Sequence, residues 1–163
     1  MKKNIVITGG LGYIGTELCK IYSGYSWNHQ ITVIDNRFVS ERVNQLRNWN
    51  INFVQGDILD KNLVLKYCEN ADIVHHLAGI TDVPRVKSES SDEQDKKIKV
   101  VAEIGTQNIL DAIQKNCKII MPSTHVVYEG IKEVKNDILE EEKTNPVLSY
   151  GISKDINEKQ LKA

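Results

Sequence analysis

Cysteine is scarce in this sequence, and its spacing excludes the common cysteine-based sites. The 163 residues include three cysteines, Cys19, Cys68 and Cys117, and no two of them form the C-x-x-C pair that zinc and redox motifs use. We expect all three to be small, buried apolar residues. His75 and His76 have no cysteine or carboxylate at metal-ligand spacing, so we expect core packing or backbone hydrogen bonds there rather than zinc binding.

An excess of charge of one sign and a long apolar run are also missing. The net charge is -1, from 21 basic and 22 acidic residues, so the chain has no general positive field to hold a nucleic-acid backbone. The first apolar run, residues 5–7, is too short for a signal peptide or a membrane span. We therefore expect a cytoplasmic protein without nucleic-acid or membrane partners. Association into a homodimer stays open.

The order of sequence patterns indicates the fold class. Short β-branched runs alternate with helical patterns, which predicts an α/β protein with a doubly wound parallel sheet. Right-handed crossovers then give the strand order 3-2-1-4-5, an NAD(P)-binding Rossmann fold in one domain, residues 1–163. The expected strands are 4–8, 30–34, 51–55, 72–76 and 118–121, and the expected helices are 13–22, 40–48, 60–69, 92–115 and one that starts after Ser149.

The helix expected at 92–115 has a clear apolar stripe. Its members recur at spacings of three and four residues and are Ile98, Val101, Gly105, Ile109 and Ala112. The stretch 82–95, around the start of this helix, is rich in charge and serine, and we expect a solvated loop there.

Three glycines lie between the first strand and the first helix. Residues 8–15 read TGGLGYIG, a G-x-x-G-x-x-G loop with glycines at 9, 12 and 15. Gly9 permits a tight turn, Gly12 lets the backbone approach a pyrophosphate, and Gly15 lets the helix lie close to the sheet. Ligands of such folds bind where the strand order reverses, so the segment from His76 to Thr81 should face this loop.

Asp35 stands at the end of the second strand, 20 residues beyond Gly15. At this place a carboxylate can accept hydrogen bonds from both hydroxyls of an adenosine ribose and repel a 2′-phosphate. The alternative is that Asp35 only caps the following loop. Arg37 could accommodate NADP, but we expect NAD as the cofactor, preferred by roughly tenfold in affinity.

Tyr150 and Lys154 are spaced i, i+4, so their side chains share one face of the last helix. A phenol has a pKa of about 10 and is a poor base at neutral pH. A neighbouring ammonium and an oxidised nicotinamide lower that pKa, which makes Tyr150 a usable general base. Ser123 and Thr124 add two hydroxyls after the fifth strand, at the edge where open α/β sheets build their sites.

These features, taken together, resemble the extended short-chain dehydrogenase/reductase family, in its NAD-dependent epimerase/dehydratase group. Four further blocks over essentially the whole chain are similar to that family: QGDI at 55–58, HLAG at 76–79, GTQNIL at 105–110 and STHVVY at 123–128. The resemblance implies three catalytic residues, Thr124, Tyr150 and Lys154, with Thr124 bonded to the reacting sugar hydroxyl. It implies no metal.

The resemblance also completes the cofactor site. Tyr13 and Ile14 would cover the pyrophosphate, Asp57 and Ile58 would flank the adenine, and residues 77–81 would line the nicotinamide side. The full expected cofactor-binding set is Gly9, Gly12, Tyr13, Ile14, Gly15, Asp35, Asn36, Arg37, Asp57, Ile58, Leu77, Ala78, Gly79, Thr81, Tyr150 and Lys154.

The activity implied is that of an NAD-dependent sugar-nucleotide epimerase, which removes and returns hydrogen at the sugar C4 through a 4-keto intermediate. A UDP-sugar is the specific expectation. The family's 4,6-dehydratases have Asp-Glu after the threonine, whereas this chain has His125 and Val126, so we do not expect dehydration. Arg37, and Glu129 at a position that is usually glycine, leave an NAD(P)H-dependent keto-sugar reductase open, and a non-catalytic NAD-binding protein is a further alternative.

Two more departures from the family concern its active site and its length. Ala102 and Glu103 replace the usual Asn-Val, so we expect one hydrogen bond near the active site to be missing. Family members are about twice as long, as a separate substrate domain of ordinary size requires. We therefore expect this chain to be the N-terminal cofactor-binding portion, without its substrate domain and inactive by itself.

Overall fold

The computed structural model describes residues 2–25, 28–81, 91–133 and 137–163. Its elements, in chain order, are β1 (Asn4–Thr8), α1 (Tyr13–Ser23), β2 (Gln30–Asp35), α2 (Ser40–Asn48), β3 (Asn52–Gln55), α3 (Lys61–Cys68), β4 (Ile73–His76), α4 (Asp92–Ala112), β5 (Lys118–Ile120), the 3-10 helix η2 (His125–Tyr128) and α5 (Ser149–Lys162). Every expected helix and strand is present, and η2 is an addition. Residues 82–90 of the expected loop lie outside the described part, and its last residues, from Asp92, belong to α4.

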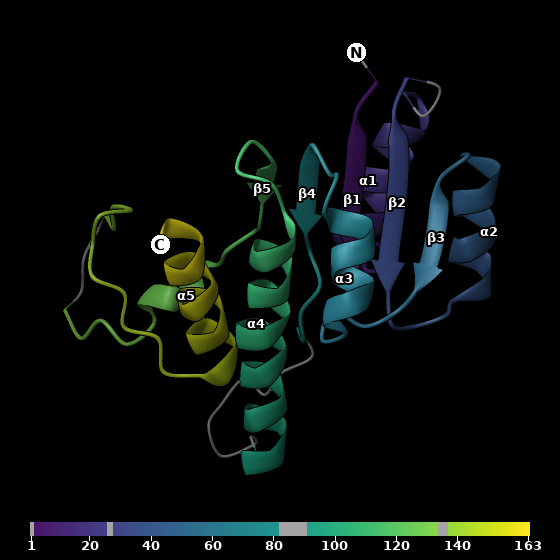
Figure 1. Ribbon diagram of the computed structural model, residues 1–163. Helices are drawn as coiled ribbons and strands as arrows, with labels where there is room; N and C mark the ends of the chain where they lie inside the picture. The colour runs from purple at the N-terminus through teal and green to yellow at the C-terminus, as the bar shows by residue number, and fades with distance from the viewer. Residues whose placement is uncertain (1, 26–27, 82–90, 134–136) are drawn as a thin grey trace. The chain divides into compact units, whose positions relative to one another are not determined.

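The strands form one parallel sheet in the order β3-β2-β1-β4-β5, which confirms the predicted topology (Figure 1). β1 pairs with β2 on one side, from Asn4 opposite Gln30 to Thr8 opposite Ile34, and with β4 on the other. The strand order therefore reverses at β1, and the carboxyl ends of β1, β2 and β4 lie side by side. This edge is where the sequence places the glycine loop and Asp35.

Contacts divide the chain into two compact units, which are described separately. Unit 1 comprises Met1–Gly79 and Gly105–Pro122 and contains the whole sheet. Unit 2 comprises Ile80–Ile104 and Ser123–Ala163 and contains η2 and α5. The expected cofactor loop thus belongs to unit 1, and the three expected catalytic residues belong to unit 2.

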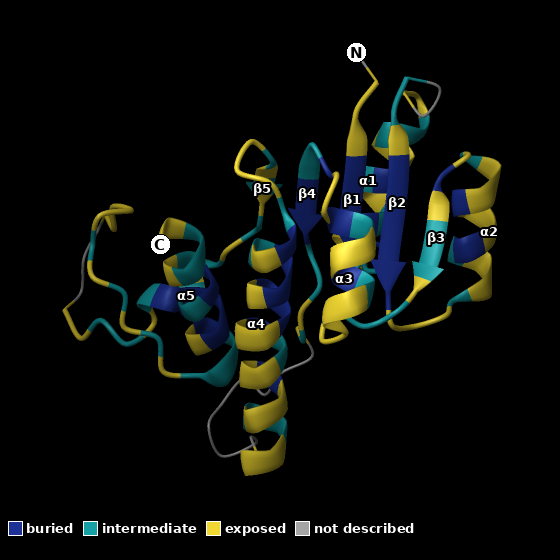
Figure 2. Ribbon diagram, in the orientation of Figure 1, coloured by how far each residue is buried: buried dark blue, intermediate teal, exposed yellow. Residues whose placement is uncertain are grey.

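The core of unit 1 lies between the inner strands and their helices. Ile5, Ile7 and Val33 are almost completely buried, because inner strands of a parallel sheet are covered on both faces (Figure 2). The cluster continues through Leu11 of the glycine loop into α1, with Cys19, and into α2, with Val43 and Leu46. Cys68 is also buried, but Cys117 is only partly buried, so the expectation of three core cysteines is wrong for Cys117. Cys117 comes just before β5, at the edge of the sheet.

Burial along α4 follows the predicted stripe. Ile98, Gly105, Ile109 and Ala112 are buried, whereas Val101 is only partly buried. Thr106 and Asn108 are buried as well, and their polar side chains form hydrogen bonds that a count of apolar residues does not reveal. Among the described residues, no helix is long and apolar enough to cross a membrane.

Hydrogen bonds within unit 2 join α5 to the N-terminal part of α4. The Asn157 side chain donates to the Ala102 carbonyl at 2.8 Å, and the Gln160 side chain donates to the Glu103 carbonyl at 2.9 Å. α5 is therefore fixed to α4 at the two positions where the sequence departs from the family pattern. These contacts do not test the expected loss of a hydrogen bond near the active site.

Candidate functional site

The glycine loop makes a tight turn against the segment that follows β4. Gly9 has a φ of 69°, in the left-handed region that favours glycine, and its N-H donates to the Ile34 carbonyl at 2.7 Å. A Cβ on Gly9 would lie 2.7 Å from the Cα of Ala78. The loop and the segment containing Ala78 are therefore in direct contact, as the position of the strand-order reversal predicts.

The N-terminus of α1 is open to an anion. Gly12 is the N-cap residue and provides no side-chain cap, and the first turn contains no acidic residue. The first N-H groups of a helix lack partners within the helix and carry a partial positive charge, which suits a phosphate. Tyr13 and Ile14 are 81% and 57% exposed in that turn. A Cβ on Gly15 would lie 2.6 Å from the Cα of Gly10, so Gly15 is required by the close packing of helix and loop.

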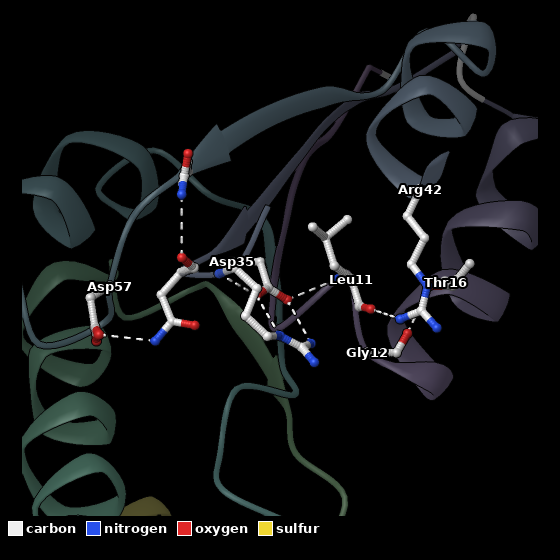
Figure 3. A network of polar contacts seen from close by, with 9 residues as sticks. Leu11, Gly12, Thr16, Asp35, Arg42 and Asp57 are labelled. Carbon is white, nitrogen blue, oxygen red and sulfur yellow. Dashed lines mark hydrogen bonds and ion pairs between the residues drawn. The ribbon is translucent and has the colours of Figure 1, made fainter. Parts of the chain in front are cut away.

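The Asp35 carboxylate lies at the end of β2 and bonds directly to the glycine loop (Figure 3). Its Oδ2 accepts the Leu11 N-H at 3.0 Å, and its Oδ1 accepts the Arg37 N-H, also at 3.0 Å. The Arg37 guanidinium adds an ion pair, with Nε 3.2 Å from Oδ1 and Nη2 3.3 Å from Oδ2. Asp35 is buried, whereas the Arg37 side chain is 57% exposed.

Asn36 and Asp57 also meet at this edge. The Asn36 side chain donates to Asp57 Oδ2 at 3.1 Å, and Asp57 Oδ1 accepts the Leu59 N-H at 3.0 Å (Figure 3). Ile58 is buried, and its carbonyl accepts a hydrogen bond from the Asn108 side chain at 2.9 Å. The structure thus brings together four of the expected cofactor residues, Asp35, Asn36, Arg37 and Asp57, and fixes the backbone of a fifth, Ile58.

Two contributors to this region were not predicted from the sequence. Arg42, on α2, donates to the carbonyl of Leu11 in the glycine loop, and Asn108, on α4, holds the backbone after Asp57. Each side chain bonds to a residue far away along the sequence, 31 residues for Arg42 and 50 residues for Asn108, and no sequence motif identifies these contacts. The weak available signal for Asn108 is its polarity on the otherwise apolar face of α4.

A buried polar network lies behind the same edge. His76 Nδ1 is 2.9 Å from Thr8 Oγ1, and His76 Nε2 is 2.9 Å from Thr106 Oγ1. Thr8 Oγ1 also accepts the Ala78 N-H at 3.3 Å, so the network fixes the segment that faces Gly9. His75 and His76 are both buried, as predicted for core residues. The His76 ring contacts the hydroxyls of Thr8 and Thr106, and the His75 ring contacts the hydroxyl of Tyr22.

The side chain of His75, the preceding residue of β4, lies on the opposite face of the sheet from that of His76. Its Nε2 is 2.8 Å from the Tyr22 hydroxyl on α1, and burial, with a smaller effect of Lys118, lowers the pKa of His75 below its usual value. Among the described residues, no group of three or more histidine, cysteine or acidic side chains could hold a metal ion.

Unit 2 presents the expected catalytic residues on η2 and α5. Thr124 is the N-cap residue of η2, and its Oγ1 accepts the Val126 N-H at 3.3 Å. Ser123, the neighbouring hydroxyl, donates to Glu158 of α5. Tyr150 is the second residue of α5. The structure therefore ties Ser123 into the scaffold of this unit and leaves Thr124 as the better candidate for a substrate contact.

Lys154 lies one helical turn after Tyr150. Its Nζ is 5.9 Å from the centre of the Tyr150 ring, as the i, i+4 spacing predicts. Lys154 is buried, and this burial lowers its pKa below the ordinary lysine value. A partly desolvated ammonium interacts more strongly with a nearby phenolate than an ammonium in water does.

The remaining expected cofactor residues are divided between the two units. Leu77 and Gly79 follow β4 in unit 1, where the Leu77 N-H donates to the Thr8 carbonyl at 3.1 Å. Thr81 is exposed and belongs to unit 2.

Comparisons with known proteins agree with this geometry. The model of the NAD dependent epimerase/dehydratase family matches residues 5–163. A UDP-N-acetyl-alpha-D-glucosaminuronate decarboxylase of Bacillus cytotoxicus is 33% identical over 78% of this chain and 38% of its own length. A UDP-glucose 4-epimerase of Mycoplasma genitalium is 31% identical over 99% of this chain and 48% of its own length.

Solved structures show the same fold. The crystal structure of UDP-glucose 4-epimerase from Brucella ovis in complex with NAD has a TM-score of 0.76 and 30% identity, over 98% of this chain and 47% of that one. The chain spans about half the length of the relatives it matches, or less. The family match, the parallel sheet, the glycine loop and the Tyr150/Lys154 pair lead to one conclusion: this chain belongs to the NAD dependent epimerase/dehydratase family.

Proposed function

We propose that this chain binds NAD and belongs to an enzyme that epimerises a sugar nucleotide at C4, with a UDP-sugar as the substrate. The observation that most strongly supports this proposal is the buried Asp35 carboxylate, which accepts a hydrogen bond from the Leu11 N-H of the glycine loop. This bond holds an acidic side chain close to the N-terminus of α1, and a dinucleotide needs an acid for its ribose and a helix end for its phosphates.

The residues of the loop fit a dinucleotide for steric reasons. A Cβ on Gly12 would lie 3.1 Å from the Gly9 carbonyl, so any larger residue would fill the space beside the open end of α1. In the proposed complex, the N-H groups of Tyr13 and Ile14 hold the pyrophosphate. Asp35 accepts the ribose hydroxyls, Asp57 and Ile58 flank the adenine, and residues 77–79 line the nicotinamide side.

The chemistry of the proposed reaction divides between the cofactor and the residues of unit 2. When bound, NAD supplies an acceptor that takes hydrogen with its electron pair from the sugar carbon and can return it. Tyr150, as the phenolate that Lys154 stabilises, takes the proton of the C4 hydroxyl and becomes a neutral phenol. Thr124 donates a hydrogen bond to the same sugar oxygen and orients it. Return of hydrogen to the opposite face of the 4-keto sugar inverts C4.

A reductase of keto sugars is the second candidate. It is favoured by Arg37, whose half-exposed guanidinium stands beside the ribose-binding carboxylate and could meet a 2′-phosphate. The reductase consumes NADPH in proportion to product, whereas the epimerase regenerates its cofactor and shows no net oxidation. Absorbance at 340 nm during turnover of a sugar nucleotide distinguishes the two reactions.

The epimerase proposal also concerns the half of the relatives' length that this sequence does not match. Because the relatives are about twice as long, we propose that their second half supplies most contacts to the sugar nucleotide. Positioning a substrate accounts for about 7 to 11 kcal/mol of barrier lowering in well-oriented reactions. The 163 residues alone are therefore expected to convert UDP-glucose to UDP-galactose far more slowly than about one turnover per second, the low end of ordinary kcat values.

Tyr150→Phe tests the proposed mechanism in a protein of the relatives' length that contains these residues. The substitution keeps the aromatic ring but deletes the proton acceptor, so we expect kcat to fall by about a hundredfold to ten-thousandfold with NAD affinity nearly unchanged. Lys154→Ala should lower both kcat and NAD affinity, because we propose, from the family resemblance, that Lys154 and Tyr150 also contact the nicotinamide ribose. A Tyr150→Phe enzyme that retains more than about a tenth of wild-type kcat would show that Tyr150 is not the base.

A further inference from the structure

We propose that Arg37 limits the affinity for NAD by competing with the cofactor ribose for the Asp35 carboxylate. This inference rests on the proposed function, because it assumes that Asp35 accepts the adenosine ribose of NAD. Its basis is the set of contacts around that carboxylate (Figure 3).

The Asp35 carboxylate is saturated by groups of its own chain. An ionised carboxylate has about four acceptor positions on its two oxygens. Two of them accept the backbone N-H groups of Leu11 and Arg37, each at 3.0 Å. The guanidinium of Arg37 takes the other two through Nε at 3.2 Å and Nη2 at 3.3 Å. A ribose that donates both hydroxyls to Asp35 must therefore displace a donor already present.

The guanidinium is the donor that can leave. The two backbone N-H groups are fixed by the turn after β1 and by the chain direction after β2, so their loss would require local unfolding. The Arg37 side chain is 57% exposed, so its guanidinium can move into water, whereas the Asp35 side chain is only 3% exposed and would accept the ribose hydroxyls in place of the guanidinium. Its departure costs the two longer hydrogen bonds and leaves the two shorter ones intact.

The guanidinium also resembles the group that it excludes. Nε and Nη2 are neighbouring donors on one rigid plane and reach both oxygens of Asp35, as the 2′ and 3′ hydroxyls of a ribose would. Nη2 lies 3.9 Å from the position of a Cβ on Gly12, so the guanidinium stands in front of the glycine loop too. Arg37 therefore occupies the proposed ribose position with matching chemistry.

The experiment is a calorimetric titration of the 163-residue chain with NAD. Arg37→Met removes the competing donors but keeps an unbranched side chain, and we expect NAD to bind about twofold to fivefold more tightly, because the ribose no longer has to displace an ion pair. Arg47→Met is the control, because Arg47 is an exposed arginine on α2, the helix that follows Arg37, and takes no part in these bonds to Asp35. Loss of its charge should leave the binding of the anionic dinucleotide unchanged or slightly weaker.

Asp35→Asn separates this inference from the proposed function. If Asp35 binds the ribose, Asp35→Asn weakens NAD binding; no loss would overturn the proposed cofactor site itself. If Arg37 acts through Asp35, Arg37→Met gives much less tightening in the Asp35→Asn background than in the wild type, which a double-mutant cycle measures. Weaker NAD binding by Arg37→Met, or the same tightening in both backgrounds, would overturn the competition while leaving the role of Asp35 intact.

Discussion

At the scale of single residues, Gly9 shows how one backbone conformation supports the candidate cofactor site. Its φ of 69° and the 2.7 Å approach of a Cβ to the Ala78 backbone predict that Gly9→Ala destabilises the chain. A left-handed residue with a Cβ costs about 1 to 2 kcal/mol, and the clash adds about 1 to 3 kcal/mol. We expect the free energy of unfolding in urea to fall by about 2 to 5 kcal/mol.

Gly24→Ala is the control for this substitution. Gly24 has a φ of -66°, and the nearest atom to its Cβ would be 3.7 Å away, so alanine fits there without strain. We expect a change within about 0.5 kcal/mol. Equal destabilisation by the two substitutions would mean that loss of glycine itself, rather than the geometry at Gly9, is the cause.

The site residues that could be predicted from the sequence differ from the others in how far along the chain their contacts lie. Gly9 directly follows β1 and Asp35 is the last residue of β2, so a local sequence pattern predicts that both lie at the edge of the sheet. Arg42 and Asn108 reach the same site from helices 31 and 50 residues away from their partners. No local pattern specifies such contacts, because they depend on how the helices pack. The Arg37 ion pair was missed for another reason: its position is local, but its partner depends on the rotamer.

At the scale of elements, strands and helices were predicted well because burial and periodicity agree. β1 and α2 have the predicted bounds, and the inner strands are apolar runs between turns. η2 was not predicted, since four residues are too few for a period to be visible. The polar ends of helices were equally hard to predict, because their caps come from distant side chains as well as from local ones.

Glu129 is such a distant cap, at the N-terminus of α5. Its Oε1 accepts the N-H groups of Val147 and Leu148 at 2.7 and 2.6 Å, and Leu148 is the N-cap residue of the helix that carries Tyr150. Glu129→Ala should cost about 0.5 to 2 kcal/mol of stability, as the loss of a helix cap does. It should also speed amide hydrogen exchange at Val147 and Leu148, measured by NMR.

Glu129→Gln is the matched variant, because its side-chain oxygen still accepts both N-H groups but its charge is gone. We expect exchange at Val147 and Leu148 close to the wild-type rate, with a loss of about 0.3 to 1 kcal/mol from the missing charge at the helix end. If alanine and glutamine give the same exchange rates as the wild type, the carboxylate does not fix the start of α5, and the position of Tyr150 must depend on other contacts.

At the scale of the whole molecule, the proposed functional groups are divided between the two units. Unit 1 contains the glycine loop, Asp35 and the segment after β4, whereas unit 2 contains Thr124, Tyr150 and Lys154. The order of motifs along the chain did not indicate this division, because α4 continues through the boundary between Ile104 and Gly105. The proposed reaction requires that one bound dinucleotide contacts both units.

Hydrogen exchange with two ligands tests that requirement on the chain itself. AMP carries the adenosine half of NAD alone, so it should slow exchange in the glycine loop, residues 9–15, and leave the amides at the start of α5 unchanged. NAD should slow exchange in both places, because the proposal assigns its nicotinamide ribose to Tyr150 and Lys154. Saturation at about one hundred times Kd stabilises the bound state by about 2.7 kcal/mol, which is a protection of about a hundredfold and easily measured. In Lys154→Ala, NAD should still protect the loop, but its protection of α5 should largely disappear. If NAD and AMP give the same pattern in the wild-type chain, with protection confined to the loop, then Tyr150 and Lys154 do not contact the cofactor, and the proposed division of work between the two units is wrong.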